Sequence, residues 1–218
     1  MLFKLGKVVG RIIAGIIILG IVLVVTYLYF IVNYPLSYQG IIKEYSEIYD
    51  VDPYLIAAII NVESKYDKNA VSNKGARGLM QISPITGRWA AEELGIDNFH
   101  LDMLFEPEIN IMIGVWYLDI LSSEFDGNMQ LILAAYNAGS GNVDNWLKDQ
   151  RYSQDGKSLS RIPFEETREY VDRVIKGIKI YQLLYEDRFE QDPSKDENQL
   201  VPFINNLRKL IKGFVLCK

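Results

Sequence analysis

The chain has 218 residues, of which 49% are apolar and 23% charged, and this size and composition fit one globular domain with appended segments. Its formal net charge of −5 lacks the basic footprint that nucleic-acid binding requires, so we expect no nucleic acid among its partners. The single cysteine, Cys217, and the single histidine, His100, exclude an intramolecular disulfide and a Cys/His zinc site.

The first feature along the chain is an apolar segment, residues 12–32, that contains 21 residues without a charge. As a helix it would be about 31 Å long, which matches the hydrocarbon core of a bilayer. Lys4, Lys7 and Arg11 precede it and predict that the N-terminus stays in the cytoplasm while the rest crosses the cytoplasmic membrane. Without these three cations the formal net charge of the remainder is −8.

Two other interpretations of this segment are less favoured. A cleaved signal peptide has a shorter apolar region and a small-residue cleavage site, whereas TYLYFIVNYPLSYQG follows here. A buried core helix of this length would usually contain a polar residue. The sequence therefore predicts an uncleaved single-pass anchor.

Beyond the anchor the pattern is helical almost throughout. A short helix is predicted in GIIKEYSEIYD, with Ile41, Ile42, Tyr45 and Ile48 on its inner side. Asp52 and Pro53 form an N-cap and a first-turn proline, which start a helix that runs to about Ser64.

Further helices are predicted by the same signals. Ser83 and Pro84 open one that stops at Gly95, and Pro107 opens another that ends before Asp126. The inner stripe of this second helix is predicted to consist of Ile109, Met112, Ile113, Trp116 and Ile120.

The remaining helices complete the predicted bundle. MQLILAAYNAG is so apolar that we expect it at the centre, and the short GNVDNWLKD follows. After the polar loop RYSQDGKSLS comes the last long helix, PFEETREYVDRVIKGIKIYQLLY, with a stripe of Val171, Val174, Ile178, Tyr181 and Tyr185.

A charged linker, EDRFEQDPSKDENQ, separates this helix from a tail that can form an amphipathic helix. Its apolar face would hold Phe203, Leu207, Leu210, Ile211 and Phe214, and Arg208, Lys209 and Lys212 lie elsewhere on it. Such a helix can lie on a membrane or pack back on the domain, and the sequence leaves both open.

The most informative residue is Glu63, at the end of the apolar run PYLIAAIIN. The positions three, four and seven residues before it are Ile60, Ile59 and Ile56, so its side chain leaves the helix on an apolar face. Burial raises the pKa of a carboxylic acid, and a glutamic acid that is protonated near neutral pH can protonate a glycosidic oxygen. Taken alone, a glutamate in the last turn of a helix is more often solvated or salt-bridged.

The surroundings of Glu63 in the sequence favour the catalytic interpretation. Gly75 and Gly78 bracket a turn where backbone can approach a ligand, and the amide of Gln81 suits N-acetyl groups and hydroxyls.

A Ser-His-Asp triad would have to use His100, the single histidine of the chain. His100 lies in a polar loop, and a histidine in such a loop is more often simply solvated.

Four motifs together resemble the soluble-type lytic transglycosylase family: ES at 63–64, AVSNKGARGLMQISPIT, AAYNAGSGNV and EETREYV. The resemblance implies an all-α, goose-type-lysozyme-like domain behind the single N-terminal transmembrane helix. It covers roughly residues 37 to 188. We therefore expect an anchor at 1–33, a catalytic domain at 34–188 and a linker with the C-terminal tail at 189–218.

Position by position, the resemblance makes Glu63 the catalytic acid and base. It also implies a set of substrate-binding residues around the cleft: Ser72, Gln81, Tyr136, Asn137, Glu166 and Tyr170. Glu166 and Tyr170 are four residues apart on one helix and so share a face. The other interpretation makes Tyr170 a core residue and Glu166 an acid favoured by the helix dipole. Ser83 departs from the family pattern, because some members have a bulkier methionine there, which puts contacts at that subsite in doubt.

The implied reaction is cleavage of the bond between N-acetylmuramic acid and N-acetylglucosamine in bacterial peptidoglycan, with a 1,6-anhydromuramoyl end as product and no metal or cofactor. Hydrolysis, as in a lysozyme, is the first alternative, and a non-catalytic glycan-binding component of a membrane machine is the second. The expected partners are glycan strands and the cytoplasmic membrane, with the catalytic domain on its outer face. Cell-wall or secretion machinery is left open as a further partner.

Overall fold

The computed structural model describes residues 2–186, 188–189, 201 and 203–205. Contacts divide the chain into two compact units, Met1–Pro35 and Leu36–Lys218. Every regular element in the described part of the chain is a helix, and strand-like pairing there is limited to isolated bridges from Arg77 to Val71 and to Ile82. The predicted all-α class is confirmed.

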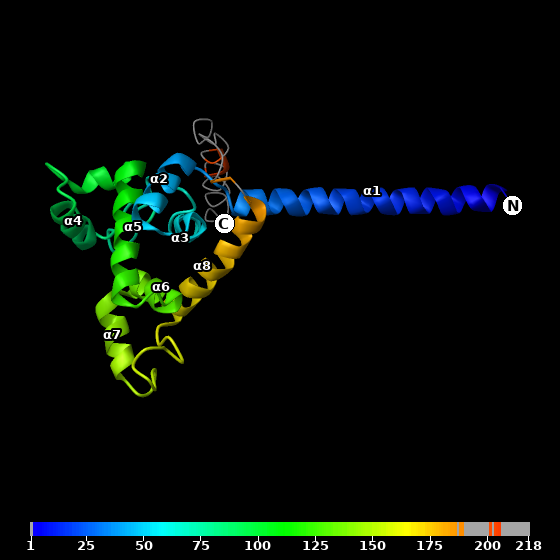
Figure 1. Ribbon diagram of the computed structural model, residues 1–218. Coiled ribbons are helices and arrows are strands. Elements are labelled where there is room, and N and C mark those ends of the chain that lie inside the picture. The colour runs from blue at the N-terminus through cyan, green and yellow to red at the C-terminus, as the bar shows by residue number, and fades with distance from the viewer. Residues whose placement is uncertain (1, 187, 190–200, 202, 206–218) are drawn as a thin grey trace, which may run out of the picture. The chain divides into compact units, whose positions relative to one another are not determined.

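The first unit consists mainly of helix α1, Leu2–Asn33 (Figure 1). Its segment Gly10–Asn33 has 24 residues and a mean hydropathy of 2.7, so it is long and apolar enough to cross a membrane. The apolar side chains along it are exposed; Ile16 is 64% and Leu23 is 61% accessible. An uncovered apolar helix of this length is what a membrane anchor requires.

Helix α2, Gln39–Tyr49, opens the second unit. Ile42 and Tyr45 are buried as predicted, but Ile48 is 59% exposed and its predicted inward position is wrong. The buried stripe starts at Gln39 and continues through Ile42 to Tyr45, at helical spacing, which turns Ile48 to the flank of the helix.

Helix α3, Pro53–Glu63, begins and ends where the sequence predicted. Its N-cap is Asp52, whose side-chain oxygen accepts a hydrogen bond of 2.8 Å from the backbone N–H of Tyr54. All residues in the range 55–61 are buried, so α3 is enclosed on every side. Glu63 therefore lies at the end of a helix that runs through the interior of the domain.

Helix α4, Pro84–Glu93, starts at the predicted N-cap, where the hydroxyl of Ser83 accepts a hydrogen bond of 3.0 Å from the N–H of Thr86. A short 3₁₀ helix, η1, Leu101–Phe105, leads into helix α5, Pro107–Glu124.

The predicted inner stripe of α5 is only partly correct. Of its five residues, Ile113 and Trp116 are buried, whereas Ile109, Met112 and Ile120 are partly exposed. Helix α5 packs against α2, α4, η1 and α6, so its buried surface is not a single stripe. The buried residues of α5 are Asn110, Ile111, Ile113, Gly114, Val115, Trp116, Leu118 and Leu121.

Three helices complete the domain: α6, Met129–Ala138; α7, Ser140–Lys148; and α8, Glu165–Leu184. Residues 131–135 of α6 are all buried, as predicted for a central helix. The stripe predicted on α8 and just beyond it is buried except for Ile178, which is partly exposed.

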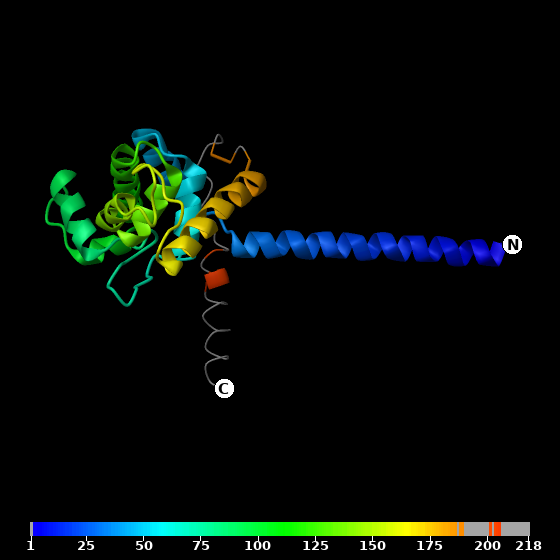
Figure 2. The same cartoon turned by 90° about the horizontal axis from the view of Figure 1, so that it is seen from below.

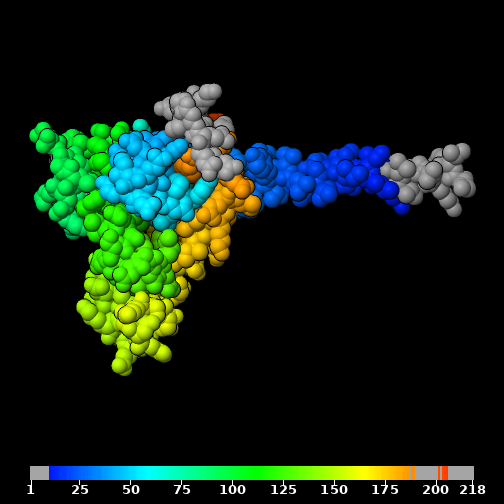
Figure 3. Space-filling view, in the orientation of Figure 1, coloured from blue at the N-terminus to red at the C-terminus, as the bar shows by residue number. Residues whose placement is uncertain are grey.

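Helix α8 packs against α3 and α6, and Figure 2 shows α3 and α8 running alongside each other. The contact is close because Gly177 has no side chain; a Cβ there would lie 3.2 Å from the Cβ of Ala58. Helix α7 and the loop that follows it form one end of the domain in the space-filling view (Figure 3). The packing of α3 and α6 against α8 brings together Glu63, Tyr136 and Tyr170.

Most of the predicted linker and tail, including Leu207, Leu210, Ile211, Phe214, Arg208, Lys209, Lys212 and Cys217, lies outside the described residues. Among the described ones, Phe189, Val201 and Ile204 are buried, and Phe203 is 65% exposed. The ring of Phe189 packs edge-on against Tyr54 at 5.2 Å between centroids, so the chain just after α8 contacts the start of α3.

Candidate active site

Glu63 is the last residue of α3, and the chain turns sharply after it. Lys65 and Tyr66 both have positive φ, 54° and 63°, a conformation that reverses the chain direction. The ring of Tyr66 is buried, and its hydroxyl donates a hydrogen bond of 3.4 Å to the carbonyl of Ala57, one turn and a half back along α3. This return contact fixes the end of the helix from which the Glu63 side chain projects.

The surroundings of Glu63 raise the pKa of its carboxyl group. Burial against the apolar face of α3 raises its pKa to about 7, and Glu166 adds to the increase. Tyr170 and Arg173 act in the opposite direction, because each stabilises the charged form. Ile56, Ile59 and Ile60, which the sequence placed behind this carboxyl, are fully buried. At neutral pH the group is therefore present in both forms, as an acid–base catalyst requires.

Two tyrosines lie close to Glu63. The Tyr170 hydroxyl is buried, and its distances and angles fit no hydrogen bond to a described residue. It is nevertheless close enough to Glu63 to lower the pKa of that carboxyl group. Burial raises the pKa of Tyr170 well above its ordinary value, and the carboxylate of Glu63 raises it further. Burial and Glu63 affect Tyr136 in the same way. Both phenols therefore stay protonated beside the carboxyl group and can donate hydrogen bonds.

The loop between α3 and α4 carries Ser72 and Gln81. Ser72 organises a tight turn: its hydroxyl accepts a hydrogen bond of 3.0 Å from the N–H of Ala76, and its carbonyl accepts one of 2.9 Å from the N–H of Gly75. Gln81 has a φ of +50°, and its side-chain amide nitrogen donates to the carbonyls of Gly78 at 2.9 Å and Ala70 at 3.2 Å. Both predicted ligand-binding side chains thus also shape the loop.

This loop is joined directly to the tyrosines. The hydroxyl of Tyr136 donates a hydrogen bond of 2.9 Å to the carbonyl of Met80, which connects α6 to the loop. Gly78 has a φ of +77°, and a Cβ there would collide with the Leu104 carbonyl at 2.1 Å and the Asn110 side chain at 2.2 Å. The absence of a side chain at Gly78 therefore lets the loop pack closely against Leu104 and Asn110.

Asn110 on α5 holds the loop, and the sequence did not single it out. Its side-chain oxygen accepts from the N–H of Met80 at 2.7 Å, and its nitrogen donates to the carbonyls of Leu104 at 2.7 Å and Arg77 at 2.9 Å. The side chain is fully buried. A polar residue in the otherwise apolar run INIMIGVW was the available signal, but the predicted stripe placed this position outside the core.

Asn137 and Glu166 line one cavity of about 490 Å³. Asn137 follows Tyr136 on α6, and Glu166 is in the first turn of α8, close enough to raise the pKa of Glu63. Glu166 therefore both lines the cavity and acts on the pKa of Glu63 through its charge. Of the seven predicted site residues, Glu63, Tyr136 and Tyr170 form a cluster, Asn137 and Glu166 line the adjoining cavity, and Ser72 and Gln81 lie on the connecting loop.

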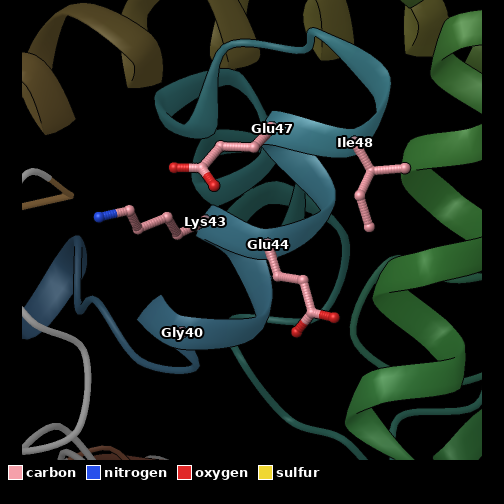
Figure 4. A pocket seen from close by; sticks show the side chains of 5 residues that line it. All are labelled: Gly40, Lys43, Glu44, Glu47 and Ile48. Atoms are coloured by element: carbon pink, nitrogen blue, oxygen red, sulfur yellow. The ribbon is translucent and has the colours of Figure 1, made fainter.

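A second cavity, of about 570 Å³, lies on the outer face of α2 and contains none of these residues (Figure 4). Lys43 and Glu47 point to one side of α2 in this view and Ile48 to the other. These side chains diverge instead of converging on a common point, so we assign no chemistry to them.

Among the residues that the structure describes, no group of three or more His, Cys, Asp or Glu side chains could hold a metal ion. His100 is exposed in its loop. The side chains gathered around Glu63 are its carboxyl group and the phenols of Tyr136 and Tyr170.

Comparison with known proteins gives one family over most of the helical unit. Residues 40–159 match the family model described as the Transglycosylase SLT domain. The soluble lytic murein transglycosylase of Salmonella typhimurium is 36% identical over 145 residues, which are 66% of this chain and 22% of that protein. The membrane-bound lytic murein transglycosylase E of Buchnera aphidicola is 34% identical over 152 residues, covering 66% of this chain and 72% of the relative.

A solved structure shows the same likeness in three dimensions. The lytic transglycosylase Slt of Pseudomonas aeruginosa, described as an inactive glutamate-to-glutamine mutant, has a TM-score of 0.62 and 35% identity over 69% of this chain and 24% of its own. The likeness confirms the predicted lysozyme-like helical fold. The chain spans only about a quarter of the length of these soluble relatives.

Proposed function

Since the chain belongs to the Transglycosylase SLT domain family, we propose that it is a lytic transglycosylase that cleaves the glycan strands of bacterial peptidoglycan. The bond broken joins C1 of N-acetylmuramic acid to O4 of N-acetylglucosamine. The observation that supports this proposal best is the carboxyl group of Glu63, whose pKa is raised to about 7 beside two protonated phenols.

In the proposed reaction Glu63 acts first as an acid and then as a base. Its proton goes to the glycosidic oxygen, the C1–O4 bond breaks, and positive charge develops at C1, where the N-acetyl oxygen of the muramoyl residue stabilises it. The Glu63 carboxylate then takes the proton of the C6 hydroxyl as O6 bonds to C1. The glutamate returns to its initial state, a 1,6-anhydro ring is formed, and no water is consumed.

The other residues of the site have supporting roles in this proposal. The phenol of Tyr170 stabilises the carboxylate form of Glu63 between the two proton transfers, consistent with its lowering of the Glu63 pKa. Tyr136 supports the same centre and holds the loop through the Met80 carbonyl. Ser72, Gln81, Asn137 and Glu166 bind the sugar along the loop and the adjoining cavity.

Two further observations support the assignment of Glu63. A glycosidase usually needs two carboxylates. The other acidic residue that acts on the pKa of Glu63 is Glu166, and it is exposed at the start of α8. A single acid–base fits intramolecular attack by the C6 hydroxyl. In addition, the Pseudomonas aeruginosa relative is described as inactive with a glutamate replaced by glutamine, the change that removes a proton donor of this kind.

The product distinguishes this reaction from hydrolysis. We expect the full-length protein in detergent, incubated with purified peptidoglycan in water enriched in heavy oxygen, to release muropeptides with unlabelled anhydromuramoyl ends. Mass spectrometry checks both the label and the loss of one water relative to a reducing end. Labelled, reducing muramic acid as the main product would assign the protein to the hydrolytic muramidases instead.

Helix α1 and the membrane-bound relatives indicate association with a membrane. We propose that α1 crosses the cytoplasmic membrane with Lys4, Lys7 and Arg11 on the inner side and the catalytic unit outside. Only five residues, 34–38, separate α1 from α2, so the distance between the end of α1 and the start of α2 is at most about 22 Å even when this segment is fully extended. The substrate would therefore be glycan close to the membrane.

This topology predicts that protease added to intact protoplasts digests the catalytic unit and leaves a membrane-embedded N-terminal fragment. N-terminal sequencing of the membrane fraction should find residues 1–33 retained. A mature protein that starts after Val32 and is recovered from the medium would contradict the proposed anchor, although it would not affect the proposed chemistry.

A further inference from the structure

The end of helix α1 has the composition of a membrane–water boundary. Its apolar segment Gly10–Asn33 has 24 residues, slightly more than the roughly 20 that cross a hydrocarbon core. Aromatic residues gather in the last turns of the helix and just after it: Tyr27, Tyr29, Phe30 and Tyr34. Tyrosine is enriched at the level of the lipid headgroups, so Asn33 corresponds to that level once α1 is inserted.

The chain enters the catalytic unit almost directly from this boundary. Leu36 is the first residue of the second unit and is only 1% exposed, so it is fixed in that unit. Three residue steps lead from Asn33 to Leu36, and they span at most about 11 Å. The surface of the unit around this entry point is therefore close to the lipid headgroups.

A row of tyrosines joins the entry point to the second half of α8. The rings of Tyr38 and Tyr66 are nearly parallel, at an angle of 8°, with their centroids 6.5 Å apart. Burial raises the pKa of Tyr66, and a hydrogen-bonding contact with Tyr181 on α8 partly offsets this increase. Tyr181 stacks in turn on Tyr185, at 5.7 Å between centroids. The last turns of α8 are thus packed next to the place where the chain enters the unit.

The outer face of these turns is apolar and basic. Leu183 comes two residues after the buried Tyr181, so it points to the opposite side of the helix, and it is 80% exposed. Lys176 and Lys179, seven and four residues before Leu183, are exposed on the same face. Residues 173–185 contain three cations and no acid, although the whole chain has a formal net charge of −5. Figure 3 shows this part of α8, in orange, at the surface of the unit.

These side chains match the surface of a bilayer. No ion pair to Lys176 or Lys179 occurs in the part of the chain that the structure describes. A phospholipid surface presents phosphate groups above hydrocarbon, and helices that lie on it combine lysines with apolar side chains in this way.

We propose that the outer stripe of α8, formed by Lys176, Lys179 and Leu183, rests on the bilayer that α1 crosses. The two ammonium groups contact anionic phospholipid headgroups, and Leu183 inserts between them. The proposal rests on the membrane anchor proposed above, and it adds a second contact that gives the catalytic unit one orientation. Tyr170 lies thirteen residues before Leu183, about 20 Å along the helix, so this contact holds the Glu63 site close to the lipid.

The test measures how close the stripe comes to lipid in the full-length protein, reconstituted at one chain per nanodisc. The discs contain phosphatidylcholine, phosphatidylglycerol and a lipid with a nitroxide on its headgroup, which quenches a nearby fluorophore. In a Cys217→Ser background, a fluorophore on Leu183→Cys should be quenched about threefold more strongly than one on Ile85→Cys. Ile85 is the matched control, because it is also an apolar helical residue with 80% exposure.

The charges are tested by neutralising pairs of lysines. Lys176→Gln combined with Lys179→Gln should lower the quenching at Leu183→Cys about twofold, because the attraction to phosphatidylglycerol is lost. The same pair should leave muropeptide release in detergent unchanged, since neither lysine belongs to the catalytic site. Lys148→Gln combined with Lys157→Gln removes the same charge from exposed positions on and after α7, and it should leave the quenching unchanged.

The possible outcomes separate this proposal from the earlier ones. Equal quenching at Leu183→Cys and Ile85→Cys overturns it, as does quenching that the pair of Lys176 and Lys179 substitutions leaves unchanged. A fluorophore signal at Leu183→Cys that depends on protein concentration in detergent overturns it by assigning the stripe to a second copy of the chain. Protein that does not enter the discs refutes the proposed anchor, and protein that enters them but cuts no glycan refutes the proposed function alone.

Discussion

Replacing Glu63 with glutamine is expected to slow glycan cleavage by about 100- to 10,000-fold while the domain remains folded. The amide has nearly the shape of the carboxylic acid, so the apolar face formed by Ile56, Ile59 and Ile60 should accommodate it. It cannot give up a proton to the glycosidic oxygen or take one from the C6 hydroxyl. The rate of release of muropeptides from purified peptidoglycan measures the effect.

Glu93 provides a matched control, because it too is the last residue of a helix but is exposed. Glu93→Gln should keep the wild-type rate within about twofold, as expected for a surface substitution away from the site. Near-normal cleavage by a folded Glu63→Gln protein would show that another group is the acid.

The raised pKa of Glu63 adds a pH dependence to the same experiment. The acid must be protonated in the first step, so the wild-type kcat/KM should fall as the pH rises through about 7. An ordinary glutamic acid would cause this fall near pH 4.3. The residual activity of Glu63→Gln should lack the descending limb near pH 7.

Replacing Asn110 with leucine is expected to lower the free energy of unfolding by about 2 to 6 kcal/mol, because it removes three hydrogen bonds and leaves two buried groups unsatisfied. Leucine has the same number of side-chain heavy atoms, so it opens no cavity. The groups left without a partner are the N–H of Met80 and the carbonyl of Leu104, whereas the carbonyl of Arg77 still accepts a hydrogen bond of 3.0 Å from the N–H of Ile82. Denaturant unfolding followed by tryptophan fluorescence measures the loss.

Asn69→Leu is the control, since the Asn69 side chain is exposed on the same loop that Asn110 holds. We expect it to change the free energy of unfolding by less than about 0.5 kcal/mol. A loss below about 1 kcal/mol for Asn110→Leu would mean that the loop keeps its conformation without this residue.

The helix boundaries could be predicted because their signals are local. Asp52 and Ser83 satisfy backbone N–H groups one turn away, and the prolines that follow them fit only the first turn of a helix. The buried faces were harder to predict, since they depend on the number of neighbours. Ile48 is exposed because the buried stripe of α2 begins at Gln39 and passes to one side of it. Ile109 is only partly buried because α5 packs against several helices, so its buried surface is not the single stripe that was predicted.

The same distinction explains which parts of the site could be predicted. Glu63 was singled out by the three isoleucines behind it, which follow helical periodicity, but its catalytic role was predicted only with the segment that follows it and the family resemblance. Asn110 was missed because its partners are the loop residues 77–80 and Leu104, and those contacts exist only after α5 has packed beneath the loop. Lys74 and Glu165 are 91 positions apart in the sequence, and both line a cavity that only the folded chain forms.

The complete enclosure of α3 limits how the proposed enzyme can be controlled. Residues 55–61 have no solvent-facing side on which this helix could open separately, so displacing it would expose the core at a cost close to that of global unfolding. Displacement of α3 is therefore a costly way to move the Glu63 carboxyl group. If Glu63 is the acid that we propose, control would come from access, that is, from which glycan strands reach it and how far from the membrane they lie.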